Sequence, residues 1–189
     1  EIHAFSCGPD NNDDMRDQLI KNFDAFHNVS DMPDQEIAEL ARKKGIDIAI
    51  DLTGYTENAR DQILAYRAAP IQVSYLGYPG SMGADFIDYL IADCTLIPVE
   101  NQKFYSEKIV HLPNCYQVSS HSNSPPSMEE PRTELGLPEQ EFVFCCFNDH
   151  YKITPREFDI WMRLLGKVQG SVLWLRWSNK SSEANLKKE

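Results

Sequence analysis

The stretch from Glu141 to Trp177 constrains the fold of this chain more than any other segment. It opens with EFVFCCFN (141–148), an apolar run rich in aromatic and β-branched residues that predicts a buried strand. After a short polar turn, TPREFDIWMRLLGKV (154–168) carries apolar residues at helical spacing. SVLWLRW (171–177) predicts a second strand. Strand, turn, helix and strand in this order are typical of a doubly wound α/β domain.

Lys152 lies in the polar turn between the first of these strands and the helix. Thr154 is a suitable N-cap, Pro155 suits the first helical position, and Glu157 would complete a capping box. In doubly wound folds, ligands bind at the carboxyl ends of the strands, where helices begin. A cation there favours a phosphate, because the free N–H groups of the helix start add positive potential. The alternative is a solvated surface lysine, which is the usual state of a lysine in a loop.

Strands and helices alternate through the amino-terminal part of the chain, which favours parallel pairing of the strands. Apolar runs predict strands over residues 2–6, 46–52, 71–76, 89–93 and 108–112. Helical spacing and capping residues predict helices over residues 14–27, from 31 or 34 to 44, and over 56–67 and 99–105. The apolar residues expected to face inward on the first two long helices are Met15, Leu19, Phe23, Phe26, Ile37, Leu40 and Ala41.

The segment GYPGSMG (77–83) is the most glycine-dense loop of the chain, and it directly follows the predicted strand 71–76. Glycine tolerates positive φ angles and allows the backbone to approach a ligand closely. We therefore expect this loop to lie at the carboxyl end of its strand and to form part of a binding site.

Composition excludes several classes of protein. The net charge of −11 disfavours a nucleic-acid partner, because phosphate neutralisation requires a basic surface. No apolar run approaches the roughly 20 residues that span a bilayer, so we expect no membrane partner. The five cysteines form no C-x-x-C pair and are interpreted as reduced, mostly buried thiols of a cytosolic protein. No cluster of residues predicts a metal site.

A change of composition marks the expected domain boundary. QVSSHSNSPPSMEEPR (117–132) is rich in Ser and Pro and poor in large apolar residues, as linkers are. We therefore predict a first domain over residues 1–116, a linker over 117–138 and a second domain starting at 139–189. About 50 residues rarely form an independent core. Both domains are expected to be incomplete, and the chain to be a piece of a longer protein.

Several motifs occur in an order and at spacings that match one enzyme family. They are DLTGYT (51–56) followed by AR (59–60), RAAPIQV (67–73) followed by LGYPG (76–80), DY (88–89) with YSEK (105–108), and FN (147–148) with YKI (151–153) and VLWL (172–175). This series resembles the catalytic region of the O-linked N-acetylglucosamine transferases, the family that includes the plant SPINDLY-like proteins. One GYPG alone would be a weak signal, but the ordered series is specific.

The resemblance implies an α/β architecture of the GT-B type, with two Rossmann-like domains. It implies a glycosyltransferase that moves N-acetylglucosamine from UDP-N-acetylglucosamine to Ser or Thr hydroxyls of an acceptor protein. It further implies no metal ion and no cofactor beyond the sugar-nucleotide donor, a cytoplasmic location, and tetratricopeptide (TPR) repeats in the full-length protein. As a piece of such an enzyme, the isolated chain is expected to be inactive.

The same resemblance implies functional residues. Lys152 matches the lysine that contacts the diphosphate, so it is the predicted catalytic residue, because a positive group must do there what a metal does elsewhere. The predicted substrate-binding residues are Asn148 and Tyr151 beside it, and Leu76, Gly77, Tyr78, Pro79 and Gly80 in the loop expected to line the sugar side.

Asp149 departs from the family pattern, in which an amide commonly follows the asparagine. A carboxylate near a diphosphate would repel it unless the carboxylate pairs with a neighbour such as His150. Two alternatives stay open. One is a SPINDLY-like O-fucosyltransferase that uses GDP-fucose, and the other is a catalytically inactive homologue that binds nucleotide or protein. A nicotinamide-dependent oxidoreductase is disfavoured, because no G-x-G-x-x-G follows a strand.

Overall fold

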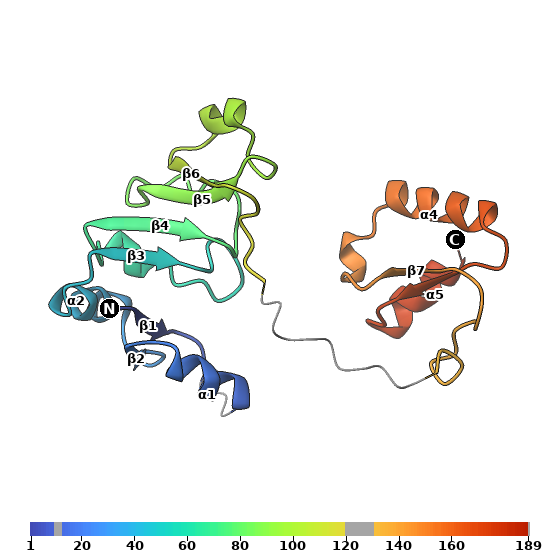
Figure 1. The fold of residues 1–189 in the computed structure, drawn as a ribbon, viewed down its shortest axis with the longest axis horizontal. Coiled ribbons are helices and arrows are strands. Elements are labelled where there is room, and N and C mark those ends of the chain that lie inside the picture. Colours follow the sequence, from blue (N-terminus) through green and yellow to red (C-terminus); the bar gives the residue numbers. More distant parts are fainter. Residues whose placement is uncertain (10–12, 120–130, 189) are drawn as a thin grey trace. The chain divides into compact units, whose positions relative to one another are not determined.

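The computed structural model describes residues 1–9, 13–119 and 131–188. The chain divides into two compact units, which we call unit 1 (up to Ser120) and unit 2 (from His121) (Figure 1). Half of the predicted linker, residues 120–130, lies outside the described residues, and the predicted domain limits stay a prediction.

The centre of unit 1 is a four-stranded sheet with the strand order β3-β4-β5-β6 (Figure 1). Its strands are β3 (Ile48–Asp51), β4 (Ile71–Tyr75), β5 (Tyr89–Asp93) and β6 (Lys108–Leu112). Every strand pair found in the described residues is parallel, which confirms the pairing expected from the alternation of elements. The carboxyl ends of these four strands therefore lie along one edge of the sheet.

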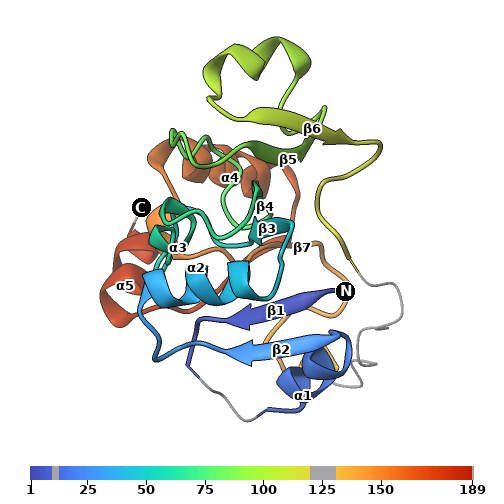
Figure 2. The ribbon, with the colours of Figure 1, turned by 90° about the vertical axis from the view of Figure 1, so that its left-hand side faces the viewer.

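A second sheet of unit 1 pairs β1 (His3–Ser6) with β2 (Ala25–Asn28), and Figure 2 shows the two strands side by side. Helix α1 (Asp14–Lys21) connects them. The rings of Phe5 and His27 pack against each other across the pair, with centroids 4.9 Å apart. Such cross-strand contacts add to the ladder hydrogen bonds that hold the pair together.

The predicted helix over residues 14–27 was wrong in its second half. The helix ends at Asn22, and residues 25–28 are extended because they exchange hydrogen bonds with β1. The inward direction expected for its apolar residues was wrong at Met15 and Leu19, whose side chains are 58% and 47% exposed. A helix of only two turns cannot present a full apolar face to the core.

Helix α2 (Asp34–Lys43) follows the sequence prediction closely, with Ile37 and Ala41 buried and Gly45 in the left-handed conformation that stops it. The helix predicted over 56–67 is reduced to α3 (Gln62–Ala65). Residues 56–61 do not form its first turns.

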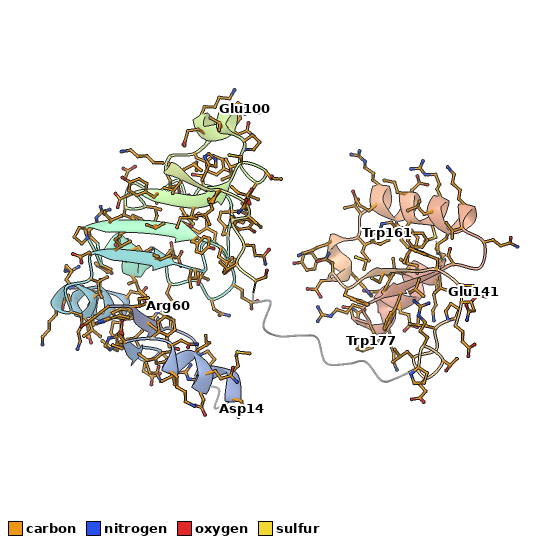
Figure 3. All side chains as sticks on the ribbon, viewed as in Figure 1. Asp14, Arg60, Glu100, Glu141, Trp161 and Trp177 are labelled. Carbon is orange, nitrogen blue, oxygen red and sulfur yellow. The ribbon has the colours of Figure 1, made fainter. Side chains whose placement is uncertain are left out.

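Two features interrupt that predicted helix. Asn58 has a φ of 61°, which is incompatible with an α-helix. The Arg60 side chain (Figure 3) reaches back to the Asp34 carboxylate, with Nε 2.8 Å from Oδ1, and to the carbonyls of Val29 and Met32. These contacts fix the segment before α3 against the start of α2.

One face of the four-stranded sheet is closed by a core that joins α2, α3 and the segment between β4 and β5. This core consists of Ala38, Ala41, Leu64, Ala68, Met82 and Ile87. The 13-residue segment 76–88, all of which is described, crosses from β4 to β5 without the helix that usually makes such a connection. Between β5 and β6, the predicted short helix is a 3-10 helix, η1 (Val99–Phe104).

The opposite face of that sheet presents apolar side chains to solvent. Side chains alternate between the two faces of a strand, so residues two apart share a face. The exposed apolar residues of this face are Ile48, Ile50, Leu52, Ile71 and Val110. This face of the sheet is therefore an exposed apolar surface.

Unit 2 contains a parallel pair, β7 (Val143–Cys146) and β8 (Val172–Leu175), with helix α4 (Pro155–Lys167) between them and α5 (Lys180–Lys188) at the end. Trp161 lies on the face of α4 turned towards the strands (Figure 3). The expected buried strands are only partly buried, because no described residue of unit 2 is fully buried.

Two further expectations need correction. The N-cap position of α4 is Thr154, as predicted, but its hydroxyl bonds the Glu157 carboxylate instead of a backbone N–H, so the capping box is not formed. The five cysteines are free, but Cys94, Cys115 and Cys145 are exposed, because they lie in loops or on an open strand face. In the described part of the chain, no helix combines the length and apolar character that a membrane span requires.

Candidate functional site

The predicted catalytic lysine lies in a short 3-10 helix, η2 (His150–Lys152), which follows β7 and leads into α4. Its backbone N–H donates to the Asp149 carbonyl at 3.0 Å, which closes the turn. The side chains of Lys152 and Tyr151 are exposed, and the Lys152 Nζ lies 6.0 Å from the centroid of the Tyr151 ring. An ammonium group at this distance is weakly attracted to the ring face and stays free to bind an anion.

The carboxylate that departs from the family pattern is paired with an arginine. Arg176 Nη1 lies 2.7 Å from Asp149 Oδ1, and the two side chains are 58% and 45% exposed. His150, the neighbour given as an example of such a partner, instead donates through its Nε2 to the carbonyl of Arg176. Arg176 therefore holds the turn through both its side chain and its backbone, and it balances the charge of Asp149.

A cavity of about 370 Å³ opens beside this turn. Its lining is polar and comes from the turn and from the start of α5: Asp149, His150, Tyr151, Ser178, Asn179 and Ser182. Asn179 Oδ1 accepts from the Ser182 N–H at 2.9 Å, so the helix start is already capped. The cavity lies at the carboxyl ends of β7 and β8, which is where doubly wound folds bind ligands.

The other predicted binding residues follow β4 in unit 1. The loop packs against the turn after β3 so closely that two glycines are required. A Cβ on Gly77 would lie 2.4 Å from the Leu52 carbonyl oxygen, and a Cβ on Gly54 would lie 2.4 Å from the Tyr78 Cβ. The Tyr55 hydroxyl donates to the Met82 carbonyl at 2.7 Å, so the two segments are also hydrogen-bonded.

Backbone strain marks the start of the same loop. Leu76 has a φ of 73°, a conformation that non-glycine residues rarely adopt. Strain of this kind persists only where surrounding contacts enforce it, and strained residues are found most often at functional sites. Of the predicted loop residues, Gly77 and Pro79 are exposed, whereas Leu76, Tyr78 and Gly80 are half-buried.

A buried polar network anchors the base of β4. The fully buried Gln72 side chain donates to the Leu64 and Phe86 carbonyls at 2.9 and 2.7 Å and accepts from the Ala68 N–H at 2.7 Å. Asp88 accepts from Arg67 at 2.8 Å and from the Gln72 N–H at 2.7 Å. Burial alone would raise the pKa of Asp88, but these hydrogen bonds lower it below its usual value.

The predicted site residues thus form two groups, which belong to different units. Asn148, Tyr151 and Lys152 share the turn of unit 2, and residues 76–80 form the loop of unit 1. Within the described residues, no three His, Cys, Asp or Glu side chains are placed to hold a metal ion together. The chemistry available at the unit 2 turn is therefore that of a free cation beside polar donors.

Sequence reasoning missed Arg176. A usable signal was present, because Arg176 directly follows β8 and Asp149 follows β7. The carboxyl ends of adjacent parallel strands meet at one edge, so opposite charges placed there come within reach of each other. It also missed the burial of Glu107 in the YSEK motif, which reads as a surface acid but is 1% exposed.

Comparison with known proteins identifies the family. A family model described as glycosyl transferase family 41 matches residues 1–131 and 127–189. A probable UDP-N-acetylglucosamine–peptide N-acetylglucosaminyltransferase, SEC, from Arabidopsis thaliana is 39% identical over 180 residues, covering 93% of this chain and 18% of that protein. The Arabidopsis protein of the same description named SPINDLY is 32% identical over 160 residues, covering 84% of this chain and 17% of its own length.

A solved structure supports the fold. It is a lysine-to-methionine mutant of the O-GlcNAc transferase of Thermobaculum terrenum, with a TM-score of 0.85 and 29% identity, and the match covers 100% of this chain and 35% of that one. The likeness confirms the predicted GT-B class of α/β fold. This chain spans less than a fifth of the curated relatives described above, and the family match covers its whole length: the chain belongs to glycosyl transferase family 41.

Proposed function

We propose that the protein carrying this chain is a glycosyltransferase that moves N-acetylglucosamine from UDP-N-acetylglucosamine to Ser or Thr hydroxyls of a protein acceptor. Membership of family 41 and the names of its relatives support the reaction class. The observation that carries the proposal is the exposed Lys152 ammonium at the carboxyl end of β7, beside a turn whose one acidic side chain is already paired with Arg176.

The roles of the residues follow from charge. The sugar leaves as a nucleoside diphosphate, so negative charge grows on the leaving group as the bond breaks. Lys152 would stabilise that charge, as a preorganised cation does without any metal. Asn148 would bind a donor oxygen as an amide donor, and Tyr151 would add ring contact beside the cavity. The loop 76–80, in which Gly77 and Pro79 are exposed, would line the sugar.

Charge balance at Asp149 supports nucleotide binding at the turn. An unpaired carboxylate beside a diphosphate would weaken binding, but the Arg176 guanidinium offsets it at 2.7 Å. Because that pair is neutral, the charge of Lys152 makes the turn positive overall. This arrangement favours binding of a nucleoside diphosphate at the turn.

On the same resemblance, we propose that the full-length protein carries TPR repeats, acts in the cytoplasm, and needs no metal or cofactor besides the donor. The isolated chain is expected to be inactive, because it supplies only part of a family 41 enzyme.

The test is a transfer assay with the full-length protein, a Ser- and Thr-containing acceptor, and labelled UDP-N-acetylglucosamine or GDP-fucose in the presence of EDTA. The proposal predicts labelling from UDP-N-acetylglucosamine only. Labelling from GDP-fucose would replace the donor assignment. No transfer from either donor, with nucleotide binding retained, would establish the inactive homologue.

A further inference from the structure

Glu107 is a fully buried acid for which the proposed chemistry has no role. Its side chain is 1% exposed, although it directly precedes β6 and belongs to no helix or strand. Among the described residues it has no ion-pair partner. An ionised carboxylate in such a place is costly to bury unless hydrogen bonds replace its water.

The hydrogen bonds of this carboxylate go almost entirely to one segment. Its Oε1 accepts from the Met82 backbone N–H at 2.6 Å, and its Oε2 accepts from the Ser81 hydroxyl at 2.7 Å. The Ser106 hydroxyl, at 3.1 Å, completes the set. Both oxygens are therefore satisfied by short bonds, as expected for hydrogen bonds to a charged acceptor.

Ser81 and Met82 immediately continue the loop 76–80. The Ser81 hydroxyl also accepts from the Gly83 N–H at 3.1 Å, and the Tyr105 hydroxyl donates to the Pro79 carbonyl at 3.4 Å. The segment 105–107 thus contacts the loop at three successive places. The crossover between β4 and β5 contains no helix of its own, so these contacts hold it in place together with the packing of Met82 and Ile87 in the core.

We propose that Glu107 is a positioning residue: its buried carboxylate fixes the conformation of the loop 76–83 and thereby sets the affinity for the sugar-nucleotide donor. The claim that Glu107 fixes the loop stands on the geometry alone. The claim that it sets the donor affinity rests on the proposed function. Glu107 acts through the loop backbone and does not itself touch the donor.

Three variants of the full-length protein distinguish a role of Glu107 in positioning the loop from an effect on protein stability alone. Glu107→Ala leaves the Met82 N–H and the Ser81 hydroxyl without their acceptor. Glu107→Gln keeps the shape, because its amide oxygen can accept from Met82 while its NH₂ donates to the rotatable Ser81 hydroxyl. Ile37→Ala is the matched destabilised control, because Ile37 is 1% exposed in α2, outside the loop.

The kinetic readout is the split between donor KM and kcat, measured well below the melting temperature of each variant. Glu107→Ala should raise the donor KM, and kcat/KM should fall by up to about 10²-fold, because a shift of about 1 Å in a binding group has that effect. Glu107→Gln should recover most of the loss. Ile37→Ala should lower the melting temperature and leave the donor KM unchanged. An unchanged KM in Glu107→Ala, or an equal rise in Ile37→Ala, would overturn the role in donor affinity.

Amide hydrogen exchange tests the loop directly and needs no activity. The Met82 N–H should exchange much faster in Glu107→Ala than in wild type, Glu107→Gln or Ile37→Ala. Equal protection in all four proteins would overturn the proposal. If the wild type transfers no sugar at all, the proposed function fails, and this exchange result still decides whether Glu107 fixes the loop. If Glu107→Ala does not fold, Ser81→Ala replaces it, with a smaller increase expected in KM and in exchange.

Discussion

The loop of unit 1 and the lysine turn of unit 2 both follow a parallel strand, yet they are held in different ways. The loop is fixed by buried polar side chains, Glu107 above all, and by close backbone contacts at Gly54 and Gly77. The turn is held by an exposed ion pair and by one histidine contact. No described residue of unit 2 is fully buried, whereas unit 1 has a closed core.

This difference indicates that the loop and the turn have different roles in binding. A loop supported by buried hydrogen bonds is preorganised before a ligand binds, so it can discriminate between ligands by their shape. A turn with exposed contacts opens at low free energy and gains order from the ligand that it binds. We expect substitutions of the residues that support the loop to alter protein stability and the fit of the ligand. We expect substitutions in the turn to alter stabilisation of the negative charge on the leaving group.

The largest effect is expected at the turn. In the full-length protein, Lys152→Ala should lower turnover by about 10² to 10³-fold, or about 2.7–4 kcal/mol, as loss of one preorganised charge stabiliser does. Stability should change little, because the side chain is exposed. Steady-state kinetics measure the effect, with Lys167→Ala in the last turn of α4 as the matched lysine control. Near wild-type turnover would remove Lys152 from the chemistry.

Loss of the buried amide in β4 should have the next largest effect, but on stability. Gln72→Leu leaves the buried Ala68 N–H without its acceptor. It also removes one of the two hydrogen bonds of the Leu64 and Phe86 carbonyls, which keep their bonds from Arg67. The free energy of unfolding should fall by about 1–3 kcal/mol, which is the cost of one buried polar group left unpaired. Urea unfolding of unit 1 measures it, and the exposed Gln62→Leu in α3 is the control. Equal midpoints for the two variants would contradict the account of the network.

The ion pair of the turn should have a smaller effect, and mainly on binding. Arg176→Ala leaves the Asp149 carboxylate unbalanced, so the Kd for UDP should rise by up to about fivefold, in line with about 1 kcal/mol for an exposed pair. Asp149→Asn in the Arg176→Ala background should restore affinity, because the unbalanced charge is then absent. A double-mutant cycle by calorimetry measures this coupling. Additive effects of the two changes would show that Arg176 does not act through Asp149.

The smallest expected effect is a mild acid sensitivity of unit 1. Burial, with Lys44 and His3 nearby, lowers the pKa of His27 below its usual value. The neutral form is therefore favoured in the folded state, and the stability it contributes is present above the unfolded pKa of about 6.5 and lost as pH falls below it. Thermal melts from about pH 7.5 to 5.5 should show a decline that His27→Phe reduces. Hydrogen bonds lower the pKa values of Asp88 and Asp93, so their contribution to folding stability is lost only near pH 4 and below. The effect of His27 on stability can therefore be measured apart from that of the two aspartates.

Sequence patterns predicted the elements whose shape depends on near neighbours. The strands 89–93 and 108–112 and helix α4 agree with their predicted positions, because apolar period and capping residues determine them locally. Residues 25–27 and 56–61 were predicted as helix and are not. Their conformations depend on partners about 20 to 30 residues away, namely β1 and the start of α2, which no local pattern reveals.

The same distinction applies to the candidate site. Lys152 and the loop 76–80 were predicted because motif and position in the α/β pattern agree. Arg176 and Glu107 were not, because a charged residue in a polar segment reads as solvated. Their roles arise from pairing across strand ends and from burial under a crossover, which only the three-dimensional arrangement specifies.

Titration of UDP into the full-length protein and its Lys152→Ala variant, with GDP as control, tests the central claim most directly. We predict saturable binding of UDP to the wild type, much weaker binding to the variant, and no comparable binding of GDP. Equal affinity of the two proteins for UDP would show that the lysine turn of unit 2 does not bind the diphosphate. It would contradict the site proposed here, while the membership of family 41 would stand.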